Sequence, residues 1–339
     1  MSQIKTSVSM YSLQDSYARH RLDLEGVLQF VKDVGAQGVE LISDQMITGT
    51  PFPSDATVTR WRDALDRSGL APVCNDIFIN STIYKNRELR VAEQVDLLKR
   101  ELDVSKRLGF DLVRLVSNTR ADVTEAALPY AEQIGMAMAL EIHAGMSFQG
   151  GLTSEWIRMM RRVQSENLGI VVDFGIFCDR HPRVSTDYFR SIGVTPEVAD
   201  AVERIYVENG DTMRAFASGD GFGDVSFPPE LTALFRSDLD AEFAFFSTGY
   251  ESTPLDVLDE YFPYIRHFHG KFYEMLEDGT EYSIDYPAIL TRLNALGYDG
   301  YISSEYEGNR FTPVDQPIHD HEQVRRHQAM LAAHLNDGK

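Results

Sequence analysis

Four ionisable side chains stand at or near the ends of short strand-like runs in the second half of the chain: Glu141, Asp173, His269 and Glu305. If these side chains meet, three carboxylates would repel one another unless a cation lay between them. Oxygen donors in excess over one imidazole nitrogen suit Mn²⁺ or Mg²⁺, and they also admit Co²⁺ or Zn²⁺. The set therefore predicts a divalent-metal site, with Mn²⁺ as the expected ion.

A further imidazole, His143, lies two positions after Glu141. Side chains on a strand alternate between its two faces, so His143 should point to the same side as Glu141 and lie further out. An imidazole titrates near neutral pH and suits the removal of a proton from a bound substrate. We expect His143 to be the general base. Alternatively, His143 is a fifth metal ligand or forms a hydrogen bond to one of the ligands.

Three more charged residues are candidates for substrate contacts. Lys271 lies two positions after His269 and could place a cation near a substrate oxygen, although a solvated lysine has the same spacing. Glu307 lies two positions after Glu305, and Glu40 ends an early run, so both could bind substrate hydroxyl groups. His267 comes two positions before His269 and is expected to lie one layer deeper, packed or behind a ligand.

The elements that position these residues alternate regularly. Eight strand candidates are recognised, and helical patterns of conventional length follow seven of them; the strand candidates cover 6–13, 38–42, 71–79, 111–117, 136–143, 168–174, 265–269 and 300–305. Alternating strands and helices imply parallel pairing, and eight such units predict a (β/α)₈ TIM barrel in which strand ends meet at one mouth. A doubly wound open sheet is the alternative, but no G-x-G-x-x-G opens a helix after an early strand.

One interval is too long for a single repeat. Between Asp173 and His269 there are 96 positions, whereas a repeat of such a barrel needs about 30–35 residues. We therefore expect one domain over residues 1–339, with an insertion at 178–262 on the C-terminal face. The insertion contains an expected helix at 195–207 and a turn-rich stretch at 219–229. It should cover the mouth or meet a partner; a surface excursion without function is the alternative.

The composition narrows the class of protein. Asp and Glu number 52 against 32 Lys and Arg, so the net charge is −20, which argues against binding to nucleic acid or to an anionic membrane. Cys74 and Cys178 are too few for a disulfide framework. No apolar run approaches the ~18 residues of a membrane span, and the N-terminus lacks a signal-peptide pattern. A cytoplasmic location is expected.

At these residues the sequence resembles the xylose isomerase-like TIM barrels, the broad sugar phosphate isomerase/epimerase group. The resemblance covers nearly the whole chain outside 178–262. It rests on the order and spacing of short segments: Gly38-Val-Glu-Leu, Leu140-Glu-Ile-His143, Val172-Asp-Phe-Gly175, His267-Phe-His-Gly-Lys271 and Ser304-Glu-Tyr-Glu307. It implies that Glu141, Asp173, His269 and Glu305 are the metal ligands. It also implies proton abstraction beside a carbonyl, with the resulting enediolate stabilised by the metal.

Within that group the chain is similar to the larger subunit of bacterial C-glycoside deglycosidases, which cleave the carbon–carbon bond between a 3-oxo sugar and an aromatic aglycone. The Glu141-Ile-His143 pair, the long insertion and an aromatic content of 11% favour this subgroup. The resemblance implies deprotonation of the sugar at C2 by His143, followed by β-elimination of the aglycone from C1. It also implies a small second subunit and a hetero-oligomer.

Other functions are compatible with part of this pattern. A keto-sugar 3-epimerase or isomerase, or an inosose dehydratase, would use the same metal-enediolate chemistry, although epimerases work with a pair of metal-bound glutamates and no additional histidine. A zinc phosphodiesterase of the endonuclease IV type needs a cationic surface and more histidine ligands, which a net charge of −20 disfavours. A metal-free binding or scaffold subunit is the alternative outside enzymes.

Overall fold

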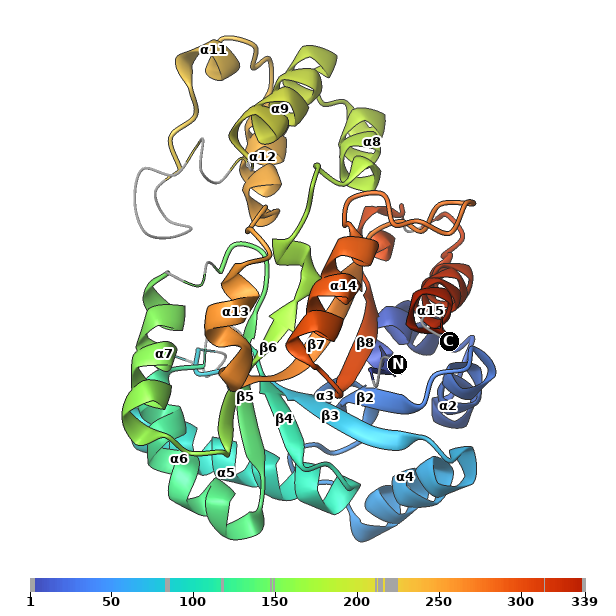
Figure 1. Ribbon diagram of the computed structural model, residues 1–339, viewed down its shortest axis with the longest axis vertical. Helices are drawn as coiled ribbons and strands as arrows, with labels where there is room; N and C mark the ends of the chain where they lie inside the picture. The colour runs from blue at the N-terminus through green and yellow to red at the C-terminus, as the bar shows by residue number, and fades with distance from the viewer. Residues whose placement is uncertain are drawn as a thin grey trace.

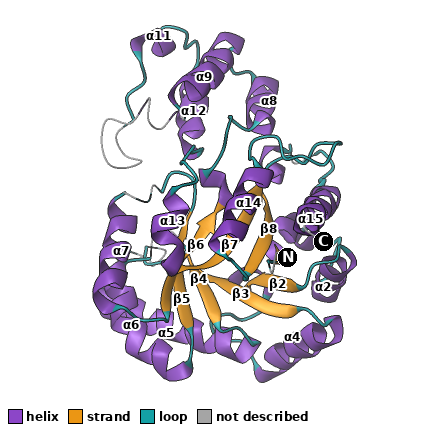
Figure 2. Ribbon diagram, viewed as in Figure 1, coloured by secondary structure: helices purple, strands orange, loops and turns teal. Residues whose placement is uncertain are grey.

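The computed structural model describes residues 4–336, except 83–85, 117–118, 147, 149, 211, 213–215, 217–224 and 314. Eight parallel strands pair in sequence order and close into a barrel (Figure 2). The strands are β1 (Lys5–Ser9), β2 (Gly38–Ile42), β3 (Ala71–Ile77), β4 (Leu112–Leu115), β5 (Ala137–Ile142), β6 (Leu168–Asp173), β7 (Ile265–Phe272) and β8 (Tyr301–Tyr306). The predicted (β/α)₈ barrel is confirmed, and the open doubly wound sheet is wrong.

Helices surround the barrel (Figure 1). The longer ones are α2 (Leu24–Asp33), α4 (Asp55–Ser68), α5 (Val91–Leu108), α6 (Ala121–Ile134), α7 (Gly151–Val163), α14 (Tyr286–Leu296) and α15 (Asp320–Asn336); α1 (Gln14–Ala18) and α3 (Ser43–Met46) are short. Local sequence sets their ends. The Ser54 hydroxyl accepts a hydrogen bond from the backbone N–H of Thr57 at the start of α4, and Gly69 ends this helix with a left-handed φ of 73°.

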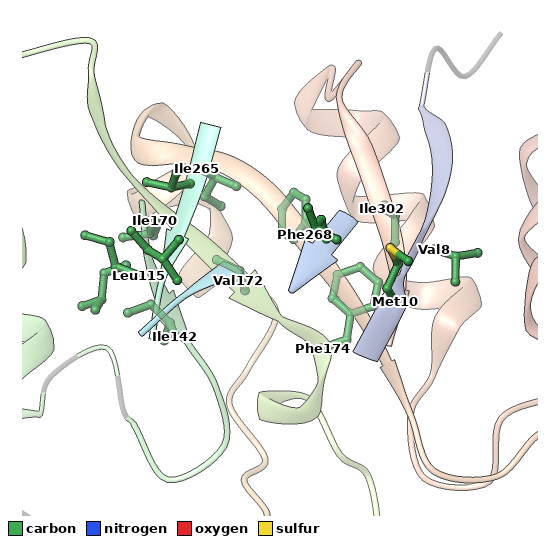
Figure 3. Close-up of a cluster of buried hydrophobic side chains, with 14 of the residues drawn as sticks. Val8, Met10, Leu115, Ile142, Ile170, Val172, Phe174, Ile265, Phe268 and Ile302 are labelled. Carbon is green, nitrogen blue, oxygen red and sulfur yellow. The ribbon is translucent and has the colours of Figure 1, made fainter. Parts of the chain in front are cut away.

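The main hydrophobic core lies between the barrel strands and the surrounding helices, and Figure 3 shows part of it, including Val8, Ile170 and Phe268. β6 is buried along its whole length, as expected for a parallel strand that is covered on both faces. Trp61 and Trp156 are fully buried, and their indole N–H groups donate to the carbonyl oxygens of Leu108 and Thr119, at 2.9 Å in each case. This packing fixes the strands whose ends carry the candidate site.

Strand register brings those ends to one level. Asp173 on β6 pairs with His269 on β7, and Lys271 on β7 pairs with Glu305 on β8.

The two cysteines, Cys74 and Cys178, are both buried and free. Among the described residues, no helix is long and apolar enough to cross a membrane.

Residues 178–262, which we call the β6–β7 segment, follow the short turn η2 (Phe174–Ile176) and contain α8 (Arg183–Ile192), α9 (Pro196–Asn209), α11 (Pro229–Thr232), α12 (Asp238–Phe246), η3 (Ser247–Gly249) and α13 (Val257–Tyr261). Figure 1 shows α8, α9, α11 and α12 beyond the barrel. They share a separate hydrophobic cluster that includes Phe189, Val202 and Phe243. Asp240 joins α12 to the start of α9, because its carboxylate accepts hydrogen bonds from the backbone N–H (2.7 Å) and the hydroxyl (2.9 Å) of Thr195.

The last helix of this segment belongs to the barrel wall. Glu260 of α13 accepts a hydrogen bond from Arg161 of α7 at 2.7 Å, and Asp259 forms an ion pair with Arg292 of α14. Thus α13 lies between α7 and α14. This is the position of the helix that follows β6 in a (β/α)₈ barrel. The expected helix at 195–207 corresponds to α9, and residues 217–224 of the expected turn-rich stretch lie outside the described residues. That 178–262 is an insertion at the barrel mouth stays a prediction.

Candidate metal centre and active site

The four predicted metal ligands lie together at the carboxyl ends of β5 to β8. Glu141, Asp173, His269 and Glu305 are buried, and one donor atom from each lies within 4.8 Å of the others. His269 Nδ1 is 3.0 Å from Glu141 Oε1 and 3.2 Å from Glu305 Oε2. Three carboxylates and one imidazole at this separation form a donor set that a single divalent cation can bind.

The hydrogen-bonding state of the cluster fits a cation. Asp173 Oδ2 and Glu305 Oε2 are buried and accept no hydrogen bond of good geometry, although Lys271 Nζ lies within ion-pair distance of both. Burial raises the pKa of Asp173 well above its usual range, and the nearby Glu305 and Glu141 carboxylates add to this against the attraction of Lys271. Unsatisfied buried oxygens are costly, and a bound cation would satisfy them.

Glu40 lies beneath the cluster, between two imidazoles. Its Oε1 atom is 2.8 Å from His269 Nε2, and its Oε2 atom is 2.7 Å from His267 Nε2. Burial opposes ionisation of Glu40, but the two imidazoles outweigh it and hold the pKa of Glu40 well below its usual range. Because the Glu40 carboxylate contacts Nε2 of His269, the Nδ1 atom of the same ring faces the cluster. Metal-binding histidines commonly have such a carboxylate on the nitrogen that does not bind the metal. His267 is buried and also contacts Ser303, in keeping with the deeper layer expected for it.

Sequence reasoning missed two members of the cluster, Asp76 on β3 and Arg114 on β4. Arg114 is buried, with its Nε atom 2.8 Å from Asp76 Oδ1 and its Nη1 atom 2.6 Å from Glu141 Oε1. The same Nη1 atom is 3.6 Å from Glu305 Oε1. The guanidinium therefore orients two predicted ligands from one side. A charged residue inside the otherwise apolar run Leu112–Leu115 is the signal that could have revealed it.

Lys271 is a buried lysine in contact with the cluster, so the solvated alternative is wrong. Its Nζ atom lies 3.0 Å from Asp173 Oδ2, 2.7 Å from Glu305 Oε2 and 3.1 Å from Glu307 Oε1. Burial opposes the charge, but these three carboxylates raise the pKa of Lys271 well above its usual value. Glu307 also forms an ion pair with Arg310 at 3.1 Å. These carboxylates therefore favour the charged form of Lys271 in the cavity lining.

A cavity of about 370 Å³ opens over the cluster. It is lined by residues from the barrel and from the β6–β7 segment: Tyr11, Phe78, Arg114, Val116, Glu141, His143, Ala144, Asp173, Phe245, Phe246, Gly249, Tyr250, Lys271, Tyr273, Glu305, Glu307 and Arg310. Glu40 is not among the described residues that line it. A cavity of this size can enclose a small organic molecule.

His143 lies at the wall of this cavity and is half-buried. Its Nδ1 atom is 2.8 Å from the carbonyl oxygen of Ala144. A carbonyl only accepts hydrogen bonds, so this contact assigns the ring proton of neutral His143 to Nδ1 and leaves a lone pair on Nε2. An imidazole held in this tautomer can accept a proton from a molecule in the cavity.

Comparison with known proteins places the chain among barrels of this kind. A family model described as Xylose isomerase-like TIM barrel matches residues 28–334. The chain belongs to this family. The match confirms the resemblance that the short motifs around Glu141, Asp173, His269 and Glu305 indicate.

Curated relatives match almost the full length. The C-glycoside deglycosidase alpha subunit of Arthrobacter globiformis is 29% identical, over 92% of this chain and 86% of its own. The 3'-dehydrocarminate deglycosidase alpha subunit of a Microbacterium species is 27% identical, over 93% and 91%. A C-glycoside deglycosidase alpha subunit of Microbacterium trichothecenolyticum is 28% identical, over 96% and 90%. The similarity to deglycosidase alpha subunits is thus confirmed.

Solved structures of epimerases share the fold. L-ribulose 3-epimerase superposes with a TM-score of 0.54 at 13% identity, covering 98% of this chain and 95% of that one. D-psicose 3-epimerase, crystallised in the presence of D-fructose, gives 0.55 at 12% identity, covering 97% and 98%. At this level of identity the likeness concerns the fold alone.

Proposed function

We propose that this chain is the catalytic alpha subunit of a C-glycoside deglycosidase. It would cleave the bond between C1 of a 3-oxo sugar and a carbon atom of an aromatic aglycone. The observation that carries the reaction class is one cavity lined by His143 and by three carboxylates, Glu141, Asp173 and Glu305, which together with the buried His269 could hold a divalent cation. The substrate class rests on the near full-length similarity to relatives named for this activity.

The reaction begins at the carbon beside the ketone. The C3 ketone makes the C2 hydrogen acidic, and His143 Nε2 removes it, so that the electron pair of the C2–H bond forms an enolate. When the C3 carbonyl re-forms, a C1–C2 double bond appears and the C1–aryl bond breaks. The aglycone leaves with the electron pair of that bond and takes up a proton on carbon. No net oxidation or reduction occurs, so this step needs no redox cofactor.

Glu141, Asp173, His269 and Glu305 would hold the divalent cation, and we propose Mn²⁺, with Mg²⁺, Co²⁺ or Zn²⁺ as alternatives. Such a cation supplies positive charge that stabilises the negative charge on the C3 oxygen. The chain's own residues would orient the sugar. We assign to Lys271 a hydrogen bond donated to a sugar oxygen, and to Glu307 a hydrogen bond accepted from a hydroxyl. Glu40, which touches both imidazoles, is assigned to holding His269 rather than to the sugar contact expected from the sequence.

We further propose that the chain works with a small second subunit, a beta subunit, in a hetero-oligomer in the cytoplasm. The relatives are named alpha subunits, which supports a partner. A net charge of −20 supports a partner other than nucleic acid or an anionic membrane. Co-purification of the tagged chain with products of neighbouring genes, followed by determination of the native mass, tests this part of the proposal.

The reaction is tested by incubating the purified chain, together with its co-purified partner and Mn²⁺, with the 3-oxo C-glucoside of a flavone and separately with ketohexoses. We expect the free flavone from the first substrate and no product from the second. Conversion of ketohexoses alone would overturn the proposal in favour of a keto-sugar 3-epimerase or isomerase.

The role of His143 is tested by His143→Gln, with His319→Gln, an exposed histidine, as the matched control. We expect His143→Gln to lose turnover by at least about a hundredfold while it binds Mn²⁺ as the wild type does. The control should keep both properties. Loss of bound Mn²⁺ in His143→Gln would make this residue a ligand instead of the base.

A further inference from the structure

Two phenylalanines of α12 expose their rings at the wall of the cavity. Phe245 is 47% exposed and Phe246 is 37% exposed, and both line the cavity that contains Glu141 and His143. The neighbouring Phe243 has no exposed surface, because it packs into the separate cluster of the β6–β7 segment. Exposed aromatic surface that continues into a deep cavity is typical of a ligand-binding site.

The ring of Phe246 is fixed by aromatic neighbours from several elements. Its centroid lies 5.6 Å from that of Phe189 on α8, 6.3 Å from that of Tyr250 and 5.9 Å from that of Phe311. Tilted and edge-to-face contacts at these distances stabilise ring orientation. Tyr250 in turn lies 5.4 Å from Tyr273, which follows β7. Aromatic side chains therefore continue from the exposed part of α12 to the end of β7.

The cavity has two chemically different parts. Its floor carries the buried carboxylates at the strand ends and the ammonium group of Lys271, which suit the hydroxyl groups of a sugar. Its lining also carries aromatic rings, namely the exposed Phe245 and Phe246 of α12 and the half-buried Phe78. A flat apolar ring fits these aromatic side chains better than a hydroxylated sugar ring does. Stacking of the apolar ring buries apolar area, and no buried hydroxyl group is left without a hydrogen-bond partner.

We propose that Phe245 and Phe246 of α12, together with Phe78 after β3, form the subsite that binds the aromatic aglycone. This inference rests on the proposed function and assigns aglycone selection to the β6–β7 segment. The flat aglycone lies against the two exposed rings while the sugar occupies the charged floor beside His143. Two exposed rings are too small for a stable protein interface, which buries about 800 Å² on each partner. Their continuity with the cavity makes a small aromatic group the occupant.

The double variant Phe245→Ala/Phe246→Ala tests this subsite in the full chain loaded with Mn²⁺. The first measurement is the affinity for a free flavone, followed by quenching of intrinsic fluorescence. The second is the exchange of the C2 hydrogen of 3-oxo-glucose, which has no aglycone, for deuterium, followed by NMR. We expect flavone affinity to fall at least about tenfold, since each aromatic contact contributes about 0.5–1.5 kcal/mol. The C2 exchange rate should stay within about twofold of the wild type.

The matched control is Phe52→Ala, which removes a ring that is 68% exposed and lies outside this cavity; it should leave both measurements unchanged. Unchanged flavone affinity in the double variant would overturn the subsite. So would an altered native mass with flavone affinity retained, because the pair would then be a subunit contact. Absence of C2 exchange in the wild type would instead overturn the proposed reaction, while the flavone titration would still decide the subsite.

Discussion

Two cations lie among the carboxylates at the carboxyl ends of the strands, and they divide the acidic groups between them. Arg114 contacts Asp76 and Glu141 from one side, and Lys271 contacts Asp173 and Glu305 from the other. Their charges offset part of the repulsion within the cluster. They also lower the electrostatic attraction that the cluster offers to a divalent metal, because each is a positive charge within a few ångströms of the donor atoms.

Replacing Lys271 by methionine should strengthen metal binding. The variant loses a positive charge that lies 3.0 Å from Asp173 Oδ2 and 2.7 Å from Glu305 Oε2. We expect Mn²⁺ affinity to rise at least about fivefold, since one unit charge at ~4 Å amounts to about 1 kcal/mol even in water. Calorimetric titration of the metal-stripped chain measures this, with the exposed Lys32→Met as the control. Weaker binding by Lys271→Met would contradict competition between the ammonium group and the metal.

Glu40→Gln should weaken metal binding without touching a predicted ligand directly. The neutral amide keeps a hydrogen-bond acceptor near His269 Nε2, where Glu40 Oε1 lies at 2.8 Å in the wild type. It removes the negative charge that makes this imidazole more basic and therefore a stronger metal ligand. We expect Mn²⁺ affinity to fall by about 10–100-fold, as for other partners of metal-binding histidines. The same titration measures it, and the surface variant Glu25→Gln should bind as the wild type does. Equal affinity in Glu40→Gln would show that Glu40 has no part in positioning His269.

The clustering of the four predicted ligands could be foreseen, because Glu141, Asp173 and Glu305 each end or nearly end a run whose sequence is typical of a strand. That these residues bind a metal stays a prediction. Arg114 was not recognised, because the expected strand continued to residue 117 and placed Arg114 in its middle, whereas β4 ends at Leu115. The role of Glu40 also required coordinates. Glu40 was expected at the end of a strand, but it is the third of five residues in β2 and lies beneath the cluster. Only the register of the eight strands shows that it faces His269 across the interior.

At the scale of elements, periodicity predicted the strands well and their ends less well. The first expected strand, 6–13, ends at Ser9 in β1, because the Ser9 hydroxyl accepts a hydrogen bond from the backbone N–H of Tyr11 and begins the short helix η1 (Met10–Leu13). The expected helix at 195–207 corresponds to α9, whereas α8 and α12 were not foreseen. These helices share a hydrophobic cluster of their own, and α8 also contacts the barrel through Arg183, which pairs with Glu274, and Tyr188, which lies against Phe311. Their apolar faces therefore serve neighbours that an ordinary barrel repeat does not have.

Phe243→Ala should loosen the β6–β7 segment while the barrel stays folded. Phe243 is fully buried in the separate cluster, with its ring 5.1 Å from that of Phe189. Removing a buried phenylalanine costs about 3–5 kcal/mol, and here the loss falls on the packing of α9 and α12. Hydrogen exchange followed by mass spectrometry should show faster exchange in these helices and unchanged exchange in α5. The neighbouring exposed variant, Phe245→Ala, is the matched control, and equal protection in both would contradict a separate cluster.

Glu101, on helix α5, should make the free energy of unfolding depend on pH. Burial raises the pKa of Glu101 from 4.5 to about 7, and the nearby Asp44 adds to this. Between these two pH values the folded chain binds more protons than the unfolded chain, so the free energy of unfolding falls as pH rises through the window. Glu101→Gln removes this loss and should be more stable than the wild type by about 3 kcal/mol at pH 8.

Urea unfolding of Glu101→Gln and the wild type at pH 5 and pH 8 measures this difference, which should shrink toward pH 5. The exposed variant Glu155→Gln should follow the wild-type curve at both pH values. A constant difference between Glu101→Gln and the wild type across the range would show that Glu101 titrates alike in the folded and unfolded chains.

At the scale of the whole molecule, a divalent metal should stabilise the fold. A ligand that binds only the folded chain, at about 100 times its Kd, raises the free energy of unfolding by about 2.7 kcal/mol. We therefore expect Mn²⁺ to raise Tm by several degrees and EDTA to reverse the change, as followed by calorimetry. Glu305→Ala should abolish the shift. If none of Mn²⁺, Mg²⁺, Co²⁺ and Zn²⁺ raises Tm, the chain would be a metal-free binding or scaffold subunit.

The barrel itself could be predicted because each strand is followed by a helix at nearly constant spacing, and the one long interval showed where the spacing changes. What fills that interval could not be predicted. The short helix α13 completes the barrel wall through Glu260 and Asp259, which contact α7 and α14, and five residues are too few for a clear helical period. Its place depends on contacts with helices that are distant in the sequence.

The β6–β7 segment leaves the barrel shortly after Asp173 and returns at Ile265, four positions before His269. Most of the helices between these points share a hydrophobic cluster of their own, whereas α13 belongs to the barrel wall. Substitutions within that cluster can therefore reshape the wall of the cavity at Phe245 and Phe246 while the strands that carry the predicted ligands keep their own core.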